Sequence, residues 1–211
     1  DDKLIFVTED EKTIRLFSNF TCIKSELRQF CSYKGESFVS IDLKTSQPYL
    51  LAHDLIKNPD YNNESDVRHF YDIITGKETD IITGKETDIY EYLIRVSGLH
   101  HLTRDEAKVE FMKVLYSKNR GYADFKPAFD IEFTTVYEYI KAVKRKQHNK
   151  LALKLQKKES MIFIPVATEY CNLGCLSVHD SLYVIESKKD FILEKLKQRF
   201  KKLGYKDFDL R

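Results

Sequence analysis

Two segments far apart in the chain, ESFVSIDL at residues 36–43 and CLSVHDSLYVI at residues 175–185, decide the fold of this protein. The first alternates apolar and polar residues and is rich in β-forming side chains, which predicts a strand that ends near Asp42. The second has two β-prone halves around His179 and Asp180, which predicts a tight hairpin with the acid at or near its turn. We therefore expect both aspartates to be held by β-structure, one near the end of a strand and the other at or near a hairpin turn.

A helix is predicted between these segments by TRDEAKVEFMKVLYSKN, residues 103–119. Thr103 followed three positions later by Glu106 forms a capping signal, and apolar residues recur at helical spacing. A spacing of four residues places one further set along a single stripe of this helix: Arg104, Lys108, Met112 and Tyr116.

Two more segments have helical patterns. Residues 134–160 predict a helix broken near His148, and residues 188–204 predict an amphipathic helix closed by Gly204. The order of strand, helices, hairpin and helix predicts an α+β fold.

The composition limits the class of protein. A chain of 211 residues, 42% of them hydrophobic, with no long apolar run, predicts one globular unit or two small ones without a membrane partner. The first residues, DDKLIFVTED, lack the basic and apolar stretches of a secretory signal, so we expect a cytoplasmic protein, in a host cell or organelle left open. The four cysteines lack zinc spacing, and we expect reduced thiols.

The charge is unevenly distributed. The formal net charge is only +2, but residues 141–158 carry a run of lysines and one arginine. This run fits a solvated helix face and a nucleic-acid contact equally well.

An eight-residue unit, DIITGKET, occurs twice in tandem over residues 72–87. It is too short for a solenoid repeat and predicts a duplicated loop or strand-turn segment. Its GKET lacks the upstream glycine that a phosphate-binding loop requires, so we reject that motif.

Two aspartates on a sheet and a helix with Arg and Lys one turn apart fit phosphoryl transfer from a nucleoside triphosphate. Paired carboxylates can hold two divalent ions about 3.5 to 4 Å apart. Arg104 and Lys108 would supply positive charge to the triphosphate oxygens, and an aromatic ring on the same helix face would pack beside a base. Each feature alone also fits an ordinary solvated surface.

The motifs together resemble those of family A DNA polymerases and their phage-type relatives. TRDEAKVEFMKVLY is similar to the fingers-helix motif, SFVSIDLKTSQPYLL to the first palm motif and LSVHDSLYV to the second, in the correct order. DIYEYLIRVSGL is similar to the Asp-Ile-His segment that leads into the fingers helix, with Tyr90 in place of His. The resemblance implies a right-hand palm with a small antiparallel sheet, and helical fingers.

The resemblance also implies roles for the matched residues. Asp42 and Asp180 would be catalytic and would hold two Mg²⁺ ions, with Mn²⁺ as an alternative and the backbone carbonyl of Leu43 as a further ligand. The incoming nucleotide would be bound by the fingers stripe of Arg104, Lys108, Met112 and Tyr116. Nucleic acid would be contacted by residues in two weaker matches, IRLFSNFT and LALKLQKKES, and in the His-Asp pair: Arg15, Gln156 and His179.

Departures from the family pattern leave the sugar preference open. The family's DNA polymerases have a Glu soon after the first aspartate that excludes ribonucleotides, and no Glu follows Asp42 here. Gln47 occupies the position of this sugar gate in an ungapped match, and Tyr49 occupies it if two residues are inserted. Ser181 after the His-Asp pair looks more like single-subunit RNA polymerases, and Met112 replaces an aromatic residue.

We therefore expect palm over residues 1–60 and 149–211, fingers over residues 61–148, and an absent or missing thumb. The predicted function is a DNA polymerase that extends a primer from dNTPs, with a DNA primer-template, nucleoside triphosphates and segments or subunits that supply a thumb as partners. The alternatives are a single-subunit RNA polymerase, a primase-like or template-independent nucleotidyltransferase, and an inactive nucleic-acid-binding relict of the same fold.

Overall fold

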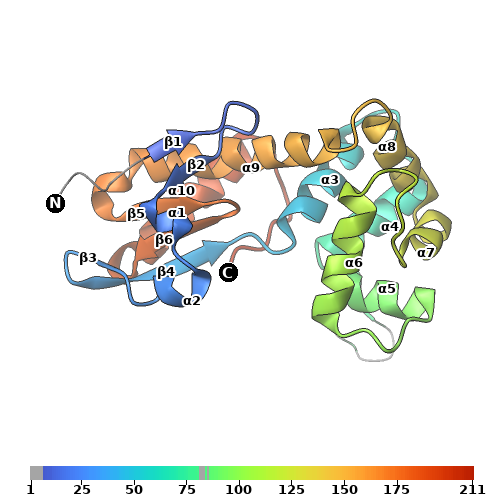
Figure 1. Cartoon of the computed structure of the whole chain (residues 1–211), viewed down its shortest axis with the longest axis horizontal. Helices are drawn as coiled ribbons and strands as arrows, with labels where there is room; N and C mark the ends of the chain where they lie inside the picture. Colours follow the sequence, from blue (N-terminus) through green and yellow to red (C-terminus); the bar gives the residue numbers. More distant parts are fainter. Residues whose placement is uncertain (1–6, 81–83, 85) are drawn as a thin grey trace. The chain divides into compact units, whose positions relative to one another are not determined.

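The protein has an α+β fold with small antiparallel sheets, as the sequence predicts (Figure 1). The computed structural model describes residues 7–80, 84 and 86–211. The chain divides into two compact units, one made of Asp1–Ser46 with Leu155–Arg211 and the other of Gln47–Lys154. These bounds differ from the predicted palm and fingers boundaries, and the assignment of the units to palm and fingers stays a prediction.

The first unit is built on a four-stranded antiparallel sheet of order β3-β4-β6-β5. Its strands are β3 (Ser32–Tyr33), β4 (Glu36–Asp42), β5 (Cys175–Val178) and β6 (Ser181–Ile185). The predicted strand and hairpin are thus confirmed, with Asp42 as the last residue of β4. Ile41, Leu182 and Val184 are fully buried, so the sheet is anchored by its apolar residues.

Short elements precede this sheet in the chain. Strands β1 (Val7–Glu9) and β2 (Leu16–Ser18) form a two-stranded antiparallel sheet, followed by the one-turn helices α1 (Asn19–Cys22) and α2 (Ser25–Arg28). Ser18 caps α1 through a reciprocal capping box with Thr21.

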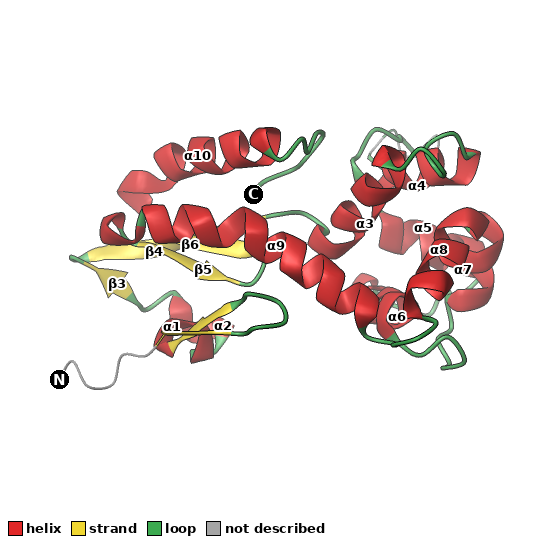
Figure 2. Cartoon of the chain, turned by 90° about the horizontal axis from the view of Figure 1, so that it is seen from above, coloured by secondary structure: helices red, strands yellow, loops and turns green. Residues whose placement is uncertain are grey.

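Two helices complete the first unit (Figure 2). Helix α10 (Lys189–Lys202) packs against β4 and β6, and the ring of its Phe200 contacts Phe163 of α9 (Lys150–Glu169), with centroids 6.1 Å apart. Helix α10 confirms the predicted C-terminal helix. Helix α9 continues nine residues beyond the predicted end at residue 160, through Pro165.

The second unit is helical. Its elements are α3 (Ser46–Lys57), α4 (Ser65–Ile74), α5 (Ile89–Ser97), α6 (Arg104–Tyr116), α7 (Lys126–Glu132) and α8 (Thr134–Lys144). Its core is aromatic, because the rings of Phe70, Phe111, Phe129 and Phe133 contact one another and are fully buried. The predicted break near His148 is confirmed, since α8 ends at Lys144 and α9 begins at Lys150.

The tandem unit does not have one conformation. In the first copy, Asp72, Ile73 and Ile74 are the last residues of α4, and Gly76 at φ 71° ends that helix. In the second copy, residues 81–83 and 85 lie outside the described residues, and Glu86 forms a β-bridge to Thr79 of the first copy. The third, incomplete unit begins with Asp88, which caps α5. The predicted loop or strand-turn therefore describes only part of the duplication.

The other predictions from composition concern cysteines and membrane spans. All four cysteines are free thiols, as expected. Over the described part of the chain, no helix combines the length and apolar character needed to cross a bilayer.

Candidate active site

The sheet of the first unit brings the two predicted catalytic aspartates close together. In the β4–β6 register Asp42 lies opposite Ser181, the first residue of β6. Asp180 directly precedes Ser181 and is the second residue of the two-residue loop that closes the β5–β6 hairpin, where Val178 pairs with Ser181. Asp42, at the end of β4, is therefore one residue out of register with Asp180, which lies in the loop directly before β6.

The hairpin loop has an unusual backbone. His179 has φ 56°, a left-handed conformation that favours glycine, whereas Asp180 has no positive φ. A positive φ at the first loop residue alone is the pattern of a type II′ turn. The hydroxyl of Ser181 donates to the carbonyl oxygen of Val178 at 2.9 Å and supports the turn. Backbone strain of this kind concentrates at functional sites.

The carboxylates of the two aspartates carry like charges and repel each other. Asp180 is half-buried, and burial followed by the charge of Asp42 raises the pKa of its carboxyl above the ordinary value. Asp42 itself is exposed. The two carboxylates are therefore close enough to affect each other electrostatically, and a bound cation would relieve their repulsion.

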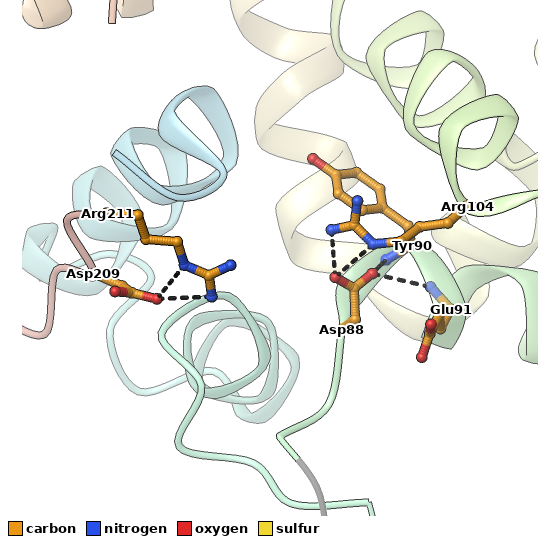
Figure 3. Close-up of polar contacts among 6 residues, drawn as sticks. All are labelled: Asp88, Tyr90, Glu91, Arg104, Asp209 and Arg211. Carbon is orange, nitrogen blue, oxygen red and sulfur yellow. Dashed lines mark hydrogen bonds and ion pairs between the residues drawn. The ribbon is translucent and has the colours of Figure 1, made fainter. Parts of the chain in front are cut away.

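Leu43 lies next to this pair. Its neighbours Asp42 and Lys44 donate their backbone N–H groups to the carbonyl oxygens of Arg211 and Asp209, at 2.8 and 2.9 Å. Backbone groups alternate in direction along an extended strand, so those of Leu43 point to the other side, toward β6. Extension of the β4–β6 register by one residue places Leu43 opposite Asp180. In the same terminal segment, Arg211 pairs with Asp209 (Figure 3).

Two carboxylates and a carbonyl oxygen are hard oxygen donors of the kind that Mg²⁺ and Mn²⁺ prefer. Across the residues that the structure describes, no group of three or more His, Cys, Asp or Glu side chains is arranged to hold a metal ion. A metal in this site would therefore depend on Asp42, Asp180 and Leu43, together with water or substrate oxygens.

A third carboxylate, which the sequence patterns above did not identify, lies within electrostatic range of Asp180. Glu159 on α9 is 1% exposed, and its oxygens accept from Arg15 Nη2 at 2.8 Å and from Ser46 Oγ at 2.7 Å. Burial and the charge of Asp180 raise the pKa of Glu159, while its hydrogen bonds with Ser46 and Arg15 lower it. The charge of Arg15 also lowers the pKa of Asp180, so Arg15 links the two carboxylates.

The sequence did contain a signal for Glu159. Leu151, Leu155, Ile162 and Val166 form an apolar stripe at helical spacing, and Glu159 occupies the gap in that stripe. A charged residue on a buried stripe must have a partner, because burial of an unpaired charge is costly. That argument points to a cation, here Arg15.

The remaining predicted nucleic-acid contacts lie in the first unit too. His179 is exposed and packs edge-on against Phe17, with centroids 6.3 Å apart. Partial desolvation and the nearby charge of Arg15 lower its pKa, which favours the neutral imidazole. Gln156 is half-buried on α9, three residues before Glu159.

In the second unit, α6 contains the whole predicted stripe. Thr103 caps the helix through a capping box with Glu106, as predicted. Arg104 is not free: its guanidinium donates to Asp88 at 2.7 and 3.2 Å and lies over the ring of Tyr90, 5.0 Å from the centroid (Figure 3). Lys108 is exposed and has no ion-pair partner among the described residues.

The other end of the stripe meets the candidate sugar-gate residues. Met112 is half-buried, and the hydroxyl of Tyr116 donates to Gln47 Oε1 at 2.5 Å. Tyr49 is 2% exposed and packs against His53, with centroids 5.8 Å apart. Gln47 thus keeps some accessible surface, and Tyr49 has almost none.

Neither the scan against protein-family models nor the search of curated proteins returns a match for this chain. The resemblance to family A polymerases therefore depends on the three ordered motifs alone.

Proposed function

We propose that the protein is a template-directed nucleotidyltransferase, a DNA polymerase that extends a primer from dNTPs. In this proposal the first unit is a polymerase palm and the second provides helical fingers. The observation that carries it is the Asp42–Asp180 pair: two carboxylates held across β4 and the β5–β6 hairpin, close enough for one charge to raise the pKa of the other. Such pairs, in a site with a strained turn, are typical of functional centres.

The donor set fits a pair of divalent ions. Asp42 and Asp180 would hold Mg²⁺ or Mn²⁺ with the Leu43 carbonyl, and ions bound there would activate the attacking hydroxyl and neutralise the leaving pyrophosphate. The chain itself holds both carboxylates in place through the sheet and the hairpin. The buried Glu159–Arg15 pair supports the same region and fixes the guanidinium for contact with a primer or template strand.

The α6 stripe would bind the triphosphate. Lys108 is exposed and uncompensated, so it is the first cation available to the phosphate oxygens. Arg104 would have to exchange Asp88 for the triphosphate, which makes Asp88 a competitor for the same guanidinium. We assign the sugar-gate role to Gln47, because Tyr49 is buried in the helical core.

The test is primer extension by the wild type and by Asp180→Asn and Asp42→Asn, with dNTPs and Mg²⁺. Either substitution should lower the rate by at least about a thousandfold, because nothing else in the site replaces a carboxylate ligand. Asp190→Asn, which removes an exposed carboxylate in the first turn of α10, is the matched control and should retain activity. Equal activity of Asp180→Asn and the wild type would refute the proposed site.

A second candidate function is ribonucleotide polymerisation. It is favoured by Gln47, whose amide is bonded to Tyr116 at the position where the family's DNA polymerases have a Glu, and by Ser181. Incorporation of NTPs and dNTPs by the wild type, compared in one assay, separates the two functions. No extension with either, combined with nucleic-acid binding that survives both aspartate substitutions, would indicate an inactive relict.

A further inference from the structure

The helical unit contains a cavity of about 470 Å³ that the proposed active site does not use. Two loops form it: one between α6 and α7, the other between α8 and α9. Its exposed cationic and titratable lining residues are Lys118, Arg120, Arg145, Lys146 and His148. We call this set the basic pocket. No acidic residue lines it, and its four Lys and Arg side chains have no ion-pair partner in the described part of the chain.

Hydrogen bonds of Lys144 and Asn119 join helix α8 to the end of α6 and the loop after it, and a hydrogen bond of Lys126 joins that loop to α7. Lys144, 3% exposed, donates from Nζ to the carbonyl oxygens of Val114 and Ser117 at 2.9 and 3.0 Å. Asn119 Nδ2 donates to the carbonyl oxygen of Lys141 at 2.9 Å, and Lys126 Nζ donates to that of Lys118 at 3.0 Å. The cations of the basic pocket therefore project from pinned backbone, and a ligand that binds them meets a preorganised site.

Like charges assembled without a counter-charge repel one another. Burial, followed by the charge of Lys126, lowers the pKa of Lys144, which lies beside these cations, to about 8. A polyanion removes that repulsion, and closely spaced Lys and Arg side chains suit consecutive phosphates of a nucleic-acid backbone.

An aromatic side chain in the same loop narrows the class of polyanion. Tyr122, two residues after Arg120, is 84% exposed, and its hydroxyl is hydrogen-bonded to Asp124. An exposed ring two residues along the chain from Arg120 is a stacking surface for an unpaired base. Free phosphate offers no base to stack, and a lipid surface has no planar group of this kind.

We infer that the basic pocket and Tyr122 bind a single-stranded nucleic-acid segment, with the phosphates on the pocket and a base on the ring. The proposed polymerase function supplies the source of such a strand, an unpaired template, and to that extent the inference rests on it. The binding site itself is argued from its own geometry and charge.

The experiment measures binding of a labelled oligothymidylate of about 16 nucleotides by fluorescence anisotropy over a series of salt concentrations. Arg145→Gln/Lys146→Gln should weaken binding about tenfold near 0.1 M salt and reduce the slope of log K against log salt by about 1.4, since two phosphate contacts are lost. Tyr122→Ala should weaken binding about fivefold without change in the slope, because stacking releases no counterions.

The matched control is Lys201→Gln/Lys202→Gln, which removes the same charge from two adjacent exposed residues at the end of α10. It should change affinity less than about twofold, because those residues contact no phosphate in this proposal. A loss as large as that of Arg145→Gln/Lys146→Gln would show a diffuse charge effect and overturn the inference. Thermal melts of each variant confirm that it is folded.

Two further arms distinguish other sources of the anion. Displacement of the oligonucleotide by inorganic pyrophosphate at equal molarity would identify a free-phosphate site and overturn the inference. Binding to phosphatidylserine vesicles that depends on Arg145 would identify a membrane-binding site. Together with oligonucleotide binding that the variants do not change, it would overturn the inference. Oligonucleotide binding with the expected variant effects but no primer extension would sustain this inference while refuting the proposed function. Primer extension without the expected variant effects on oligonucleotide binding would sustain the proposed function and refute this inference.

Discussion

The carboxylate pair of the first unit and the basic pocket of the second both bring together side chains of like charge. The charge is negative in the first and positive in the second. Burial and the charge of Asp42 raise the pKa of Asp180, whereas burial and the charge of Lys126 lower the pKa of Lys144 to about 8. Arg104, in contrast, has a counter-charge in Asp88. Like charges gathered in this way suit a ligand of opposite charge, which we propose to be a divalent cation in the first unit and a nucleic acid in the second.

The largest expected effect concerns Lys144. Its pKa of about 8 in the folded state lies below the ordinary 10.5, so between these values the unfolded state binds more protons and stability rises with pH. The wild type should gain about 2 kcal/mol from this group between pH 8 and 10, and Lys144→Met should lose that gain. Urea denaturation at both pH values measures the difference.

The control for Lys144 is Lys146→Met, because Lys146 is exposed in the same loop. Lys146→Met should keep the wild-type dependence on pH. If Lys144→Met also keeps the wild-type dependence on pH, the pKa of Lys144 is not lowered in the folded protein. The contrast between Lys144 and Asp180 is then refuted.

The next effect tests the acidic side. Because the pKa of Asp180 is raised, the folded state binds its proton more tightly than the unfolded state does, and stability falls as pH rises through that range. At pH 8 without metal, Asp180→Asn should therefore be more stable than the wild type. Mg²⁺ at ten times its Kd should stabilise the wild type by about 1.4 kcal/mol and Asp180→Asn much less.

Thermal melts with Mg²⁺ and with a chelator measure this response. Asp190→Asn should respond to Mg²⁺ as the wild type does, since its carboxylate lies on α10. An equal response in Asp180→Asn would mean that the ion binds elsewhere.

The smallest effect should come from a charge that already has its partner. Asp88→Asn removes the ion pair with Arg104, which is half-exposed, and should cost at most about 1 kcal/mol. Asn still caps α5, whereas Asp88→Ala also removes the bonds to the N–H groups of Tyr90 and Glu91 and should cost about 1 kcal/mol more. Chemical denaturation of the two variants separates the charge from the cap.

Local patterns predicted the elements that alternation, turn residues or caps mark in the sequence. The strand at residues 36–43, the hairpin around Asp180, α6 and α10 all follow from alternation, turn residues or caps. Helices α3, α4, α5 and α7 were not predicted. They contribute Tyr49, Phe70, Tyr90 and Phe129 to the helical core. Helix α4 does have a regular apolar stripe, Val67, Phe70, Tyr71 and Ile74, from which it could have been predicted.

The site was predictable only in part, because several of its contacts join residues far apart in the chain. The strand and turn placed Asp42 and Asp180, because each depends on a few neighbouring residues. The Arg15–Glu159 and Gln47–Tyr116 contacts join residues far apart in the chain, and no local rule specifies them. The Asp88–Arg104 pair needed the turn between α5 and α6, which brings the start of each helix together.

The tandem DIITGKET unit has a consequence at the level of the gene. Because the segment that follows the second copy also begins with Asp-Ile, removal of one whole unit leaves the same residues at both junctions, up to α4 on one side and from Asp88 on the other. The repeat consists of whole codons, so replication slippage that gains or loses a unit preserves the reading frame. The connection between α4 and α5 is thus a place where this lineage can change the length of its protein in steps of eight residues without rewriting either helix.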